Sequence, residues 1–130
     1  MTEQLTVTTE RVDDIPILLA HMIKMGLPNL LDEYFAVHGN WQGLSLGWTS
    51  VVWLAHILSE GDHRLNQVQP WVEKRLDTLA GCTGQPVETL AFSDDRLAGV
   101  LTRLSDDQRW AEFEMALNQR TLRVYDLRPA

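Results

Sequence analysis

Residues 45–60, "SLGWTSVVWLAHILSE", constrain the fold of this chain more than any other stretch. Apolar side chains fall on most faces of a helix drawn through these residues, whereas a helix on the surface of a domain keeps one face polar. Such a helix is stable only where other elements surround it. The sequence therefore predicts a central buried helix over about 45–60 that ends at Gly61.

Shorter helices are expected on both sides of the central helix. Apolar residues recur there at three- and four-residue spacing, and glycines and prolines separate the segments. No segment shows the sustained alternation of polar and apolar residues that is typical of strands. We therefore expect an all-α fold, a compact bundle of six to eight short helices around the central one. The expected helices are 14–25, 28–37, 63–69, 70–80, 94–104 and 106–122.

Three helix boundaries carry specific expectations. Asp62 is placed to cap the helix that follows it. Pro70 removes a backbone donor, so a break is expected near Gln69. Ser105 and Gln108 have the spacing of a capping box, which marks the start of the last helix.

Composition and charge limit the function classes open to the chain. Its 130 residues are 45% hydrophobic and 22% charged, the balance of one ordinary globular domain. We expect an N-terminal arm over residues 1–10 and a single helical domain over residues 11–130. The net charge of −7 repels phosphate backbones on average, so a nucleic-acid role would need a local cluster of positive side chains.

A cytoplasmic location without a membrane partner is expected. Cys82 is the single cysteine, so no intrachain disulfide can form, which fits a reducing compartment. The N-terminus has no cationic region followed by an apolar run and is therefore no secretory signal. The longest apolar stretch, 44–58, is shorter than the roughly 20 residues that span a bilayer.

Four titratable residues, His56, Glu60, Asp62 and His63, cluster at the end of the predicted central helix. His56 and Glu60 are four residues apart and share a helix face, as pairs of zinc ligands do. The HExxH pattern and further ligands are absent, which favours a helix end with a hydrogen-bonded histidine. Ser59 has neither a nucleophile-elbow motif nor an oxyanion loop around it. We predict no catalytic residue, metal, cofactor or small-molecule substrate.

The candidate DNA-binding surface consists of Arg64, Gln67, Lys74 and Arg75. They lie in the polar stretch "HRLNQVQPWVEKR", which follows the turn after the central helix in the outline of a helix-turn-helix. Arginine and glutamine read base edges, and lysine and arginine hold phosphates. The same residues also fit a solvated helix face, and that alternative stays open.

Three segments, "DDIPILLAHMIKMGL", "LSEGDHRL" and "SDDRLAGVL", resemble one family in order and spacing. The resemblance is to the amino-terminal domain, of unassigned function, of DDE-type insertion-sequence transposases, and it covers residues 11–127. It implies a domain that recognises the terminal inverted repeats or helps to assemble the transposase dimer. The catalytic RNase-H-like core, whose acidic triad holds two metal ions, would follow the chain, and Asp126 is not part of that triad.

These expectations combine into a non-catalytic transposase domain that contributes to binding of the element's DNA ends. The alternative is a protein-interaction or dimerisation module without DNA contact, whose partner is a second copy or the parent transposase. The net charge of −7 fits this alternative. Trp41 and Trp71 flank predicted loops or helix starts, so we expect them to be exposed and able to anchor an interface.

Overall fold

The computed structural model describes residues 12–35 and 41–124. The expected N-terminal arm, residues 1–10, lies outside this part of the chain, as do residues 36–40 and 125–130. Every regular element in the described part is a helix, which confirms the all-α prediction. The elements are α1 (Ile15–Lys24), α2 (Leu27–Tyr34), α3 (Leu46–Glu60), the 3-10 turn η1 (Leu65–Gln67), α4 (Val68–Glu73), α5 (Leu76–Thr83), the 3-10 turn η2 (Thr89–Phe92), α6 (Asp94–Leu104) and α7 (Asp107–Val124).

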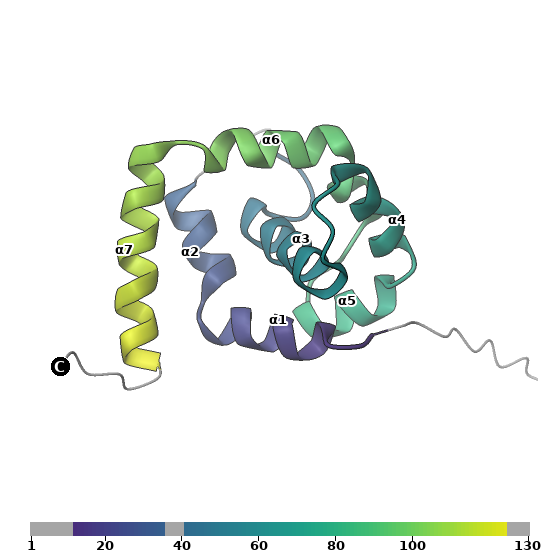
Figure 1. Cartoon of the computed structure of the whole chain (residues 1–130), viewed down its shortest axis with the longest axis horizontal. Coiled ribbons are helices and arrows are strands. Elements are labelled where there is room, and N and C mark those ends of the chain that lie inside the picture. The colour runs from purple at the N-terminus through teal and green to yellow at the C-terminus, as the bar shows by residue number, and fades with distance from the viewer. Residues whose placement is uncertain (1–11, 36–40, 125–130) are drawn as a thin grey trace, which may run out of the picture.

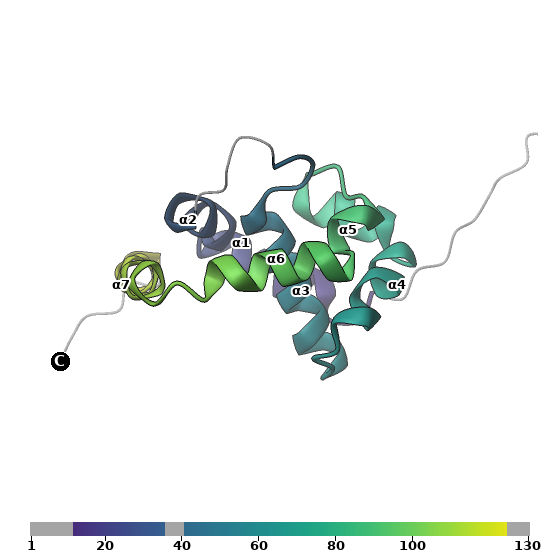
Figure 2. The ribbon, with the colours of Figure 1, turned by 90° about the horizontal axis from the view of Figure 1, so that it is seen from above.

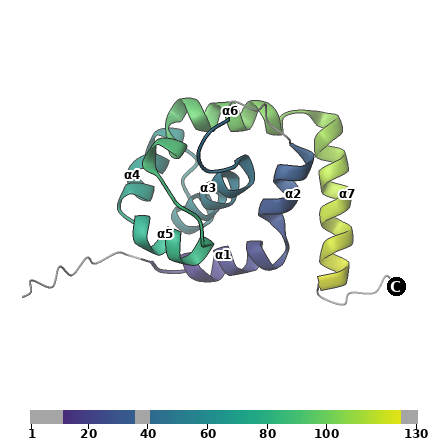
Figure 3. The same cartoon turned by 180° about the vertical axis from the view of Figure 1, so that it is seen from behind.

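Helix α3 runs through the centre of a ring formed by α1, α2, α6, α4 and α5 (Figure 1). Figure 3 shows the same ring from behind. The Ser45 hydroxyl caps the first turn of α3 by accepting the Trp48 N–H at 3.2 Å. Gly61 ends the helix in the left-handed conformation, with φ 63°. The predicted central buried helix is thereby confirmed, with both of its ends.

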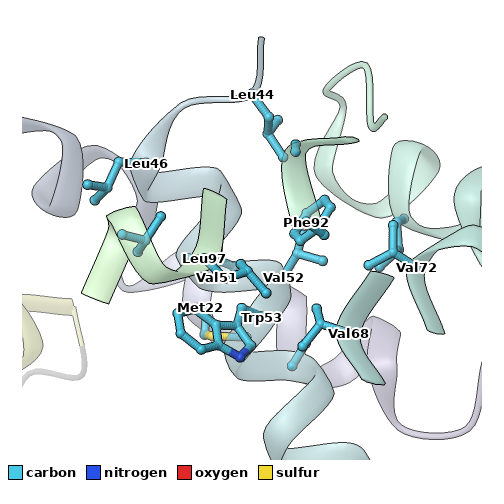
Figure 4. Packing of buried hydrophobic residues seen from close by; sticks show 14 of the residues in the cluster. Met22, Leu44, Leu46, Val51, Val52, Trp53, Val68, Val72, Phe92 and Leu97 are labelled. Carbon is cyan, nitrogen blue, oxygen red and sulfur yellow. The ribbon is translucent and has the colours of Figure 1, made fainter. Parts of the chain in front are cut away.

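The core lies where α3 meets α4, η2 and α6 (Figure 4). Burying one such aliphatic or aromatic side chain contributes about 1.5–3 kcal/mol. These contacts fix α4 against α3 and so place the polar residues at the junction of the two helices. The fully buried side chains of this region include Val51, Val52, Val68, Val72, Phe92 and Leu97.

Helix α7 stands at one edge of the molecule, beside α2 (Figure 2). Phe113 is its one buried residue, at 4% exposed. The apolar spacing of residues 106–122 would also turn Trp110 and Leu122 inward, but each is 41% exposed. Leu117 is partly buried against the core. Because α7 has neighbours on one side only, its buried face is narrower than the apolar spacing of its sequence predicts.

The segment after α3 differs from the expected helix over 63–69. Asp62 accepts the backbone N–H of Arg64 at 3.0 Å and does not cap a helix. The chain then passes through η1 into α4, where Pro70 lies in the first turn and its missing N–H leaves no bond broken. The single helix expected over 70–80 is two helices, because α4 ends at Glu73 and α5 begins at Leu76.

The last helix is capped one residue later than expected. The Asp106 carboxylate accepts the Arg109 N–H at 3.1 Å, whereas the Ser105 hydroxyl donates to the Leu101 carbonyl at 2.7 Å. A hydroxyl satisfied by the preceding turn cannot cap the next helix.

Among the described residues, no helix is long and apolar enough to span a membrane.

Candidate functional site

A polar pocket of about 270 Å³ lies at the C-terminal end of α3, against η1 and α4. It brings together three of the four predicted DNA contacts, Gln67, Lys74 and Arg75. Arg64, the fourth, does not line it, but its ion-pair partner Asp62 does. We call this the polar pocket; it is lined by His56, Glu60, Asp62, Gln67, Pro70, Trp71, Lys74 and Arg75.

One wall of the polar pocket is a Trp71–Arg75–Glu60 network. The Trp71 indole N–H donates to Glu60 Oε1 at 3.1 Å, and Arg75 Nη1 donates to the Trp71 carbonyl at 3.0 Å. The Arg75 guanidinium carbon lies 4.9 Å from the centroid of the Trp71 ring, a cation–π contact. Arg75 is 8% exposed and Trp71 6%. The expectation of an exposed Trp71 is therefore wrong, because its ring is covered by Arg75.

Arg64 makes a two-pronged ion pair with Asp62 at the mouth of the site. Arg64 Nη2 donates to Asp62 Oδ2 at 2.9 Å and Arg64 Nε to Asp62 Oδ1 at 3.1 Å. These bonds hold the pKa of Asp62 down at about 2. The Arg64 side chain is nevertheless 71% exposed. It can reach a partner, but its guanidinium is already paired with Asp62.

His56 is the most buried polar group of the pocket, at 2% exposed. Its ring meets the Trp71 ring edge-on, with centroids 5.1 Å apart. Burial lowers the pKa of His56 from 6.5, an effect that Asp62 and Glu60 oppose. Its Nδ1 has no hydrogen-bond partner among the described residues, contrary to the hydrogen-bonded histidine expected from the sequence. His56 is therefore an incompletely satisfied imidazole on the pocket wall, and its burial favours the neutral form.

Three of the residues considered for metal binding, His56, Glu60 and Asp62, line one pocket but are not placed to share a metal ion. The search of residues 12–35 and 41–124 finds no group of three His, Cys, Asp or Glu side chains placed to hold a metal ion. The Ser59 hydroxyl donates to the Asp14 carboxylate at 2.9 Å, across to the start of α1. It therefore joins two helices and does not pair with His56.

Two arginines of α6 support the loop before α3. The guanidinium carbons of Arg96 and Arg103 lie 3.8 and 5.1 Å from the centroid of the Trp41 ring. Arg96 also donates to the Leu44 carbonyl at 3.1 Å, and the Trp41 indole donates to the same carbonyl at 3.0 Å. Trp41 is thus partly buried against the core and not a fully exposed anchor. These cations hold the loop in place, which the spacing of the sequence did not reveal.

A second pocket, of about 370 Å³, lies on another face of α3, which α2, α6 and α7 also border. Sequence reasoning missed it, because four elements distant in the chain build it. No pattern within a single segment indicates such a pocket. We call this the apolar pocket; it is lined by Leu27, Leu31, Ser50, Trp53, Leu54, Ile57, Leu101, Leu104, Trp110, Phe113 and Leu117.

Comparison of the chain with family models, with curated proteins and with solved structures finds no match in any of the three. The resemblance to transposase amino-terminal domains therefore stays a prediction from the sequence motifs.

Proposed function

We propose that this chain is the non-catalytic amino-terminal domain of a DDE-type transposase and contributes to binding of the element's DNA ends. The family resemblance of the sequence motifs supports the proposal. The structural observation that carries it is the exposed Lys74, which forms no ion pair with any described residue, on the same pocket as Gln67. Arg64, 71% exposed, lies on the same segment.

Few lysine and arginine side chains at the polar pocket are available to bind phosphates, and this limits how the domain can bind DNA. Arg75 is buried in the pocket wall and Arg64 is already paired with Asp62. Each phosphate neutralised by a lysine or arginine contributes about −0.9 to the slope of log K against log salt concentration. We therefore expect a shallow slope of about −1 to −2, far below that of a repressor with many phosphate contacts.

Fluorescence anisotropy across a salt series tests the proposal. A duplex with the terminal inverted repeat of the element is compared with a random duplex of the same length. We expect preference for the inverted repeat, and Lys74→Ala should reduce the steepness of the slope by about 1. Lys24→Ala is the matched control, since it removes the other lysine of the chain, from α1. Negligible binding of both duplexes at low salt would reject the proposal.

The apolar pocket favours a second candidate function, self-association through α3, α6 and α7. Leu54, Leu101 and Trp110 at its border are 36%, 44% and 41% exposed. Clustered exposed apolar side chains of this kind mark interaction surfaces. Sedimentation over a concentration range tests for a dimer that Leu101→Glu abolishes. Leu90→Glu, at a residue 73% exposed on η2, is the control. A monomer at every concentration contradicts this candidate.

A further inference from the structure

We propose that the polar pocket receives one protruding phosphate group. This inference rests on the proposed function, which makes DNA the source of the phosphate. The group is the terminal phosphate of a DNA strand. The inference names the chemical group that the site recognises and predicts that strand ends are preferred over continuous backbone.

The local charge balance of the pocket favours a single anion. Lys74 and Arg75 line the pocket together with Glu60 and Asp62. Arg75 lies 3.9 Å from Glu60, and Asp62 is paired with Arg64, which leaves the charge of Lys74 uncompensated. One net positive charge is therefore retained here, although the chain as a whole carries −7. A multiply charged stretch of backbone would meet repulsion outside this pocket.

The hydrogen-bonding groups of the pocket fit a phosphate. Its oxygens accept hydrogen bonds only, and Lys74, Gln67 and Arg75 supply donors from the ammonium, amide and guanidinium groups. Such charge-assisted bonds are shorter and stronger than neutral ones. His56 also lines the pocket, but its Nδ1 is almost inaccessible, so the contacts to a phosphate come from Lys74, Gln67 and Arg75.

The shape of the site selects a protruding group. His56 is 2% exposed and Trp71 6%, so the polar groups at the back of the pocket lie below the surface. A phosphodiester within a duplex is flanked by sugars on both sides, whereas a terminal phosphomonoester extends from a single sugar. The monoester also carries a charge of about −1.5 to −2, more than one diester linkage. A terminal phosphate can therefore approach the buried Arg75, which is 8% exposed, more closely than a backbone phosphate flanked by two sugars.

The test compares blunt duplexes of one sequence that end in a 5′-phosphate, a 3′-phosphate or hydroxyls only, each with the full chain. We expect one of the phosphorylated ends to bind about tenfold more tightly than the hydroxyl ends, the effect of one charge-assisted hydrogen bond. Lys74→Ala and Gln67→Ala should remove this preference, and Lys24→Ala should retain it. In a parallel arm, inorganic phosphate should shift the Trp71 indole resonance in NMR spectra.

The outcomes separate this inference from the proposed function. Equal affinity for phosphate and hydroxyl ends, with duplex binding still weakened by Lys74→Ala, overturns the inference and leaves DNA binding in place. A Trp71 shift with inorganic phosphate but no binding of any duplex supports the phosphate pocket and rejects DNA as its source. If neither phosphate nor duplex binds, both are rejected.

Discussion

The polar and the apolar pocket share α3 but are built in different ways. The lining of the polar pocket comes from one continuous stretch, residues 56–75, in which charged and hydrogen-bonding groups pair with one another. The lining of the apolar pocket is drawn from residues 27–117 and contains Ser50 as its one hydroxyl. A local site should therefore survive loss of distant packing, whereas the apolar pocket should depend on α7 staying docked.

Phe113→Ala should have the largest effect and should separate the two regions. The Phe113 ring lies 5.6 Å from that of Phe35 and 5.3 Å from that of Trp110, between centroids, and it anchors α7. Emptying this position should lower the free energy of unfolding by about 3–5 kcal/mol. Urea denaturation measures the loss, with Met115→Ala, at a residue 65% exposed on the same helix, as the control.

The comparison also predicts that Phe113→Ala changes the apolar pocket and leaves the polar pocket unchanged. The indole resonance of Trp110 should shift in NMR spectra, whereas that of Trp71 should stay in place. A shift of the Trp71 resonance as large as that of Trp110 would show that the two pockets are coupled and that the polar pocket is not a local unit.

Gly47→Ala should be next in size, because it displaces α2 from α3. An added Cβ would collide with the Pro28 carbonyl oxygen, and the Gly47 N–H already donates to Asp32 Oδ1 at 2.7 Å. Overpacking of this kind costs about 1–3 kcal/mol. Gly81→Ala in α5 is the matched control, since nothing lies within 4 Å of its added Cβ, and it should stabilise by about 0.5–1 kcal/mol. Thermal denaturation of both variants checks the opposite signs.

Trp71→Phe should have a smaller effect, confined to the polar pocket. It removes the indole donor to Glu60, bonded at 3.1 Å, and keeps an aromatic ring beside His56. Loss of one such bond costs about 1 kcal/mol. Trp41→Phe, which removes the indole bond to Leu44 at 3.0 Å, should cost a similar amount. Only Trp71→Phe should move the His56 ring resonances; a similar shift in both variants would contradict the separation of the regions.

Arg64→Ala should have the smallest effect on stability and a distinct effect on titration. Arg64 holds the pKa of Asp62 at about 2, below the ordinary 3.8. A pKa depressed by folding stabilises the fold above the ordinary value, and that stabilisation is lost as the pH falls through the folded value. In Arg64→Ala, the Asp62 pKa should rise toward 3.8 in an NMR titration. Arg109→Ala, which removes the ion pair with Asp106, should leave the Asp62 titration unchanged.

Local patterns predicted the elements whose causes are themselves local. The helices expected over 45–60 and 94–104 begin where Ser45 and Ser93 accept backbone N–H groups from Trp48 and Arg96. Gly61 ends α3 where a left-handed residue is required. Each of these interactions joins residues only a few positions apart, so the spacing of residue types can indicate it, although the equally local caps expected at Asp62 and Ser105 were wrong.

Reasoning from spacing failed where a residue had two roles open to it. Pro70 breaks a helix when it lies inside one and is tolerated in a first turn, and the packing of Val68 and Val72 into the core decided for the first turn. Trp71 flanks a predicted loop, but the same packing turned its ring inward. Gln67, Lys74 and Arg75 of the candidate site line one pocket, although the burial of Arg75 was not foreseen.

The periodicity of apolar side chains is a property of one segment, and it is enough to predict that this protein is helical and that residues 46–60 form its centre. Which polar groups meet depends on the packing of the helices. The Trp71 indole met Glu60 across eleven positions, Ser59 met Asp14 across 45, and Arg96 met Leu44 across 52. Such pairings depend on how the helices pack in space, and the spacing of residues along the sequence does not show which helices will pack together.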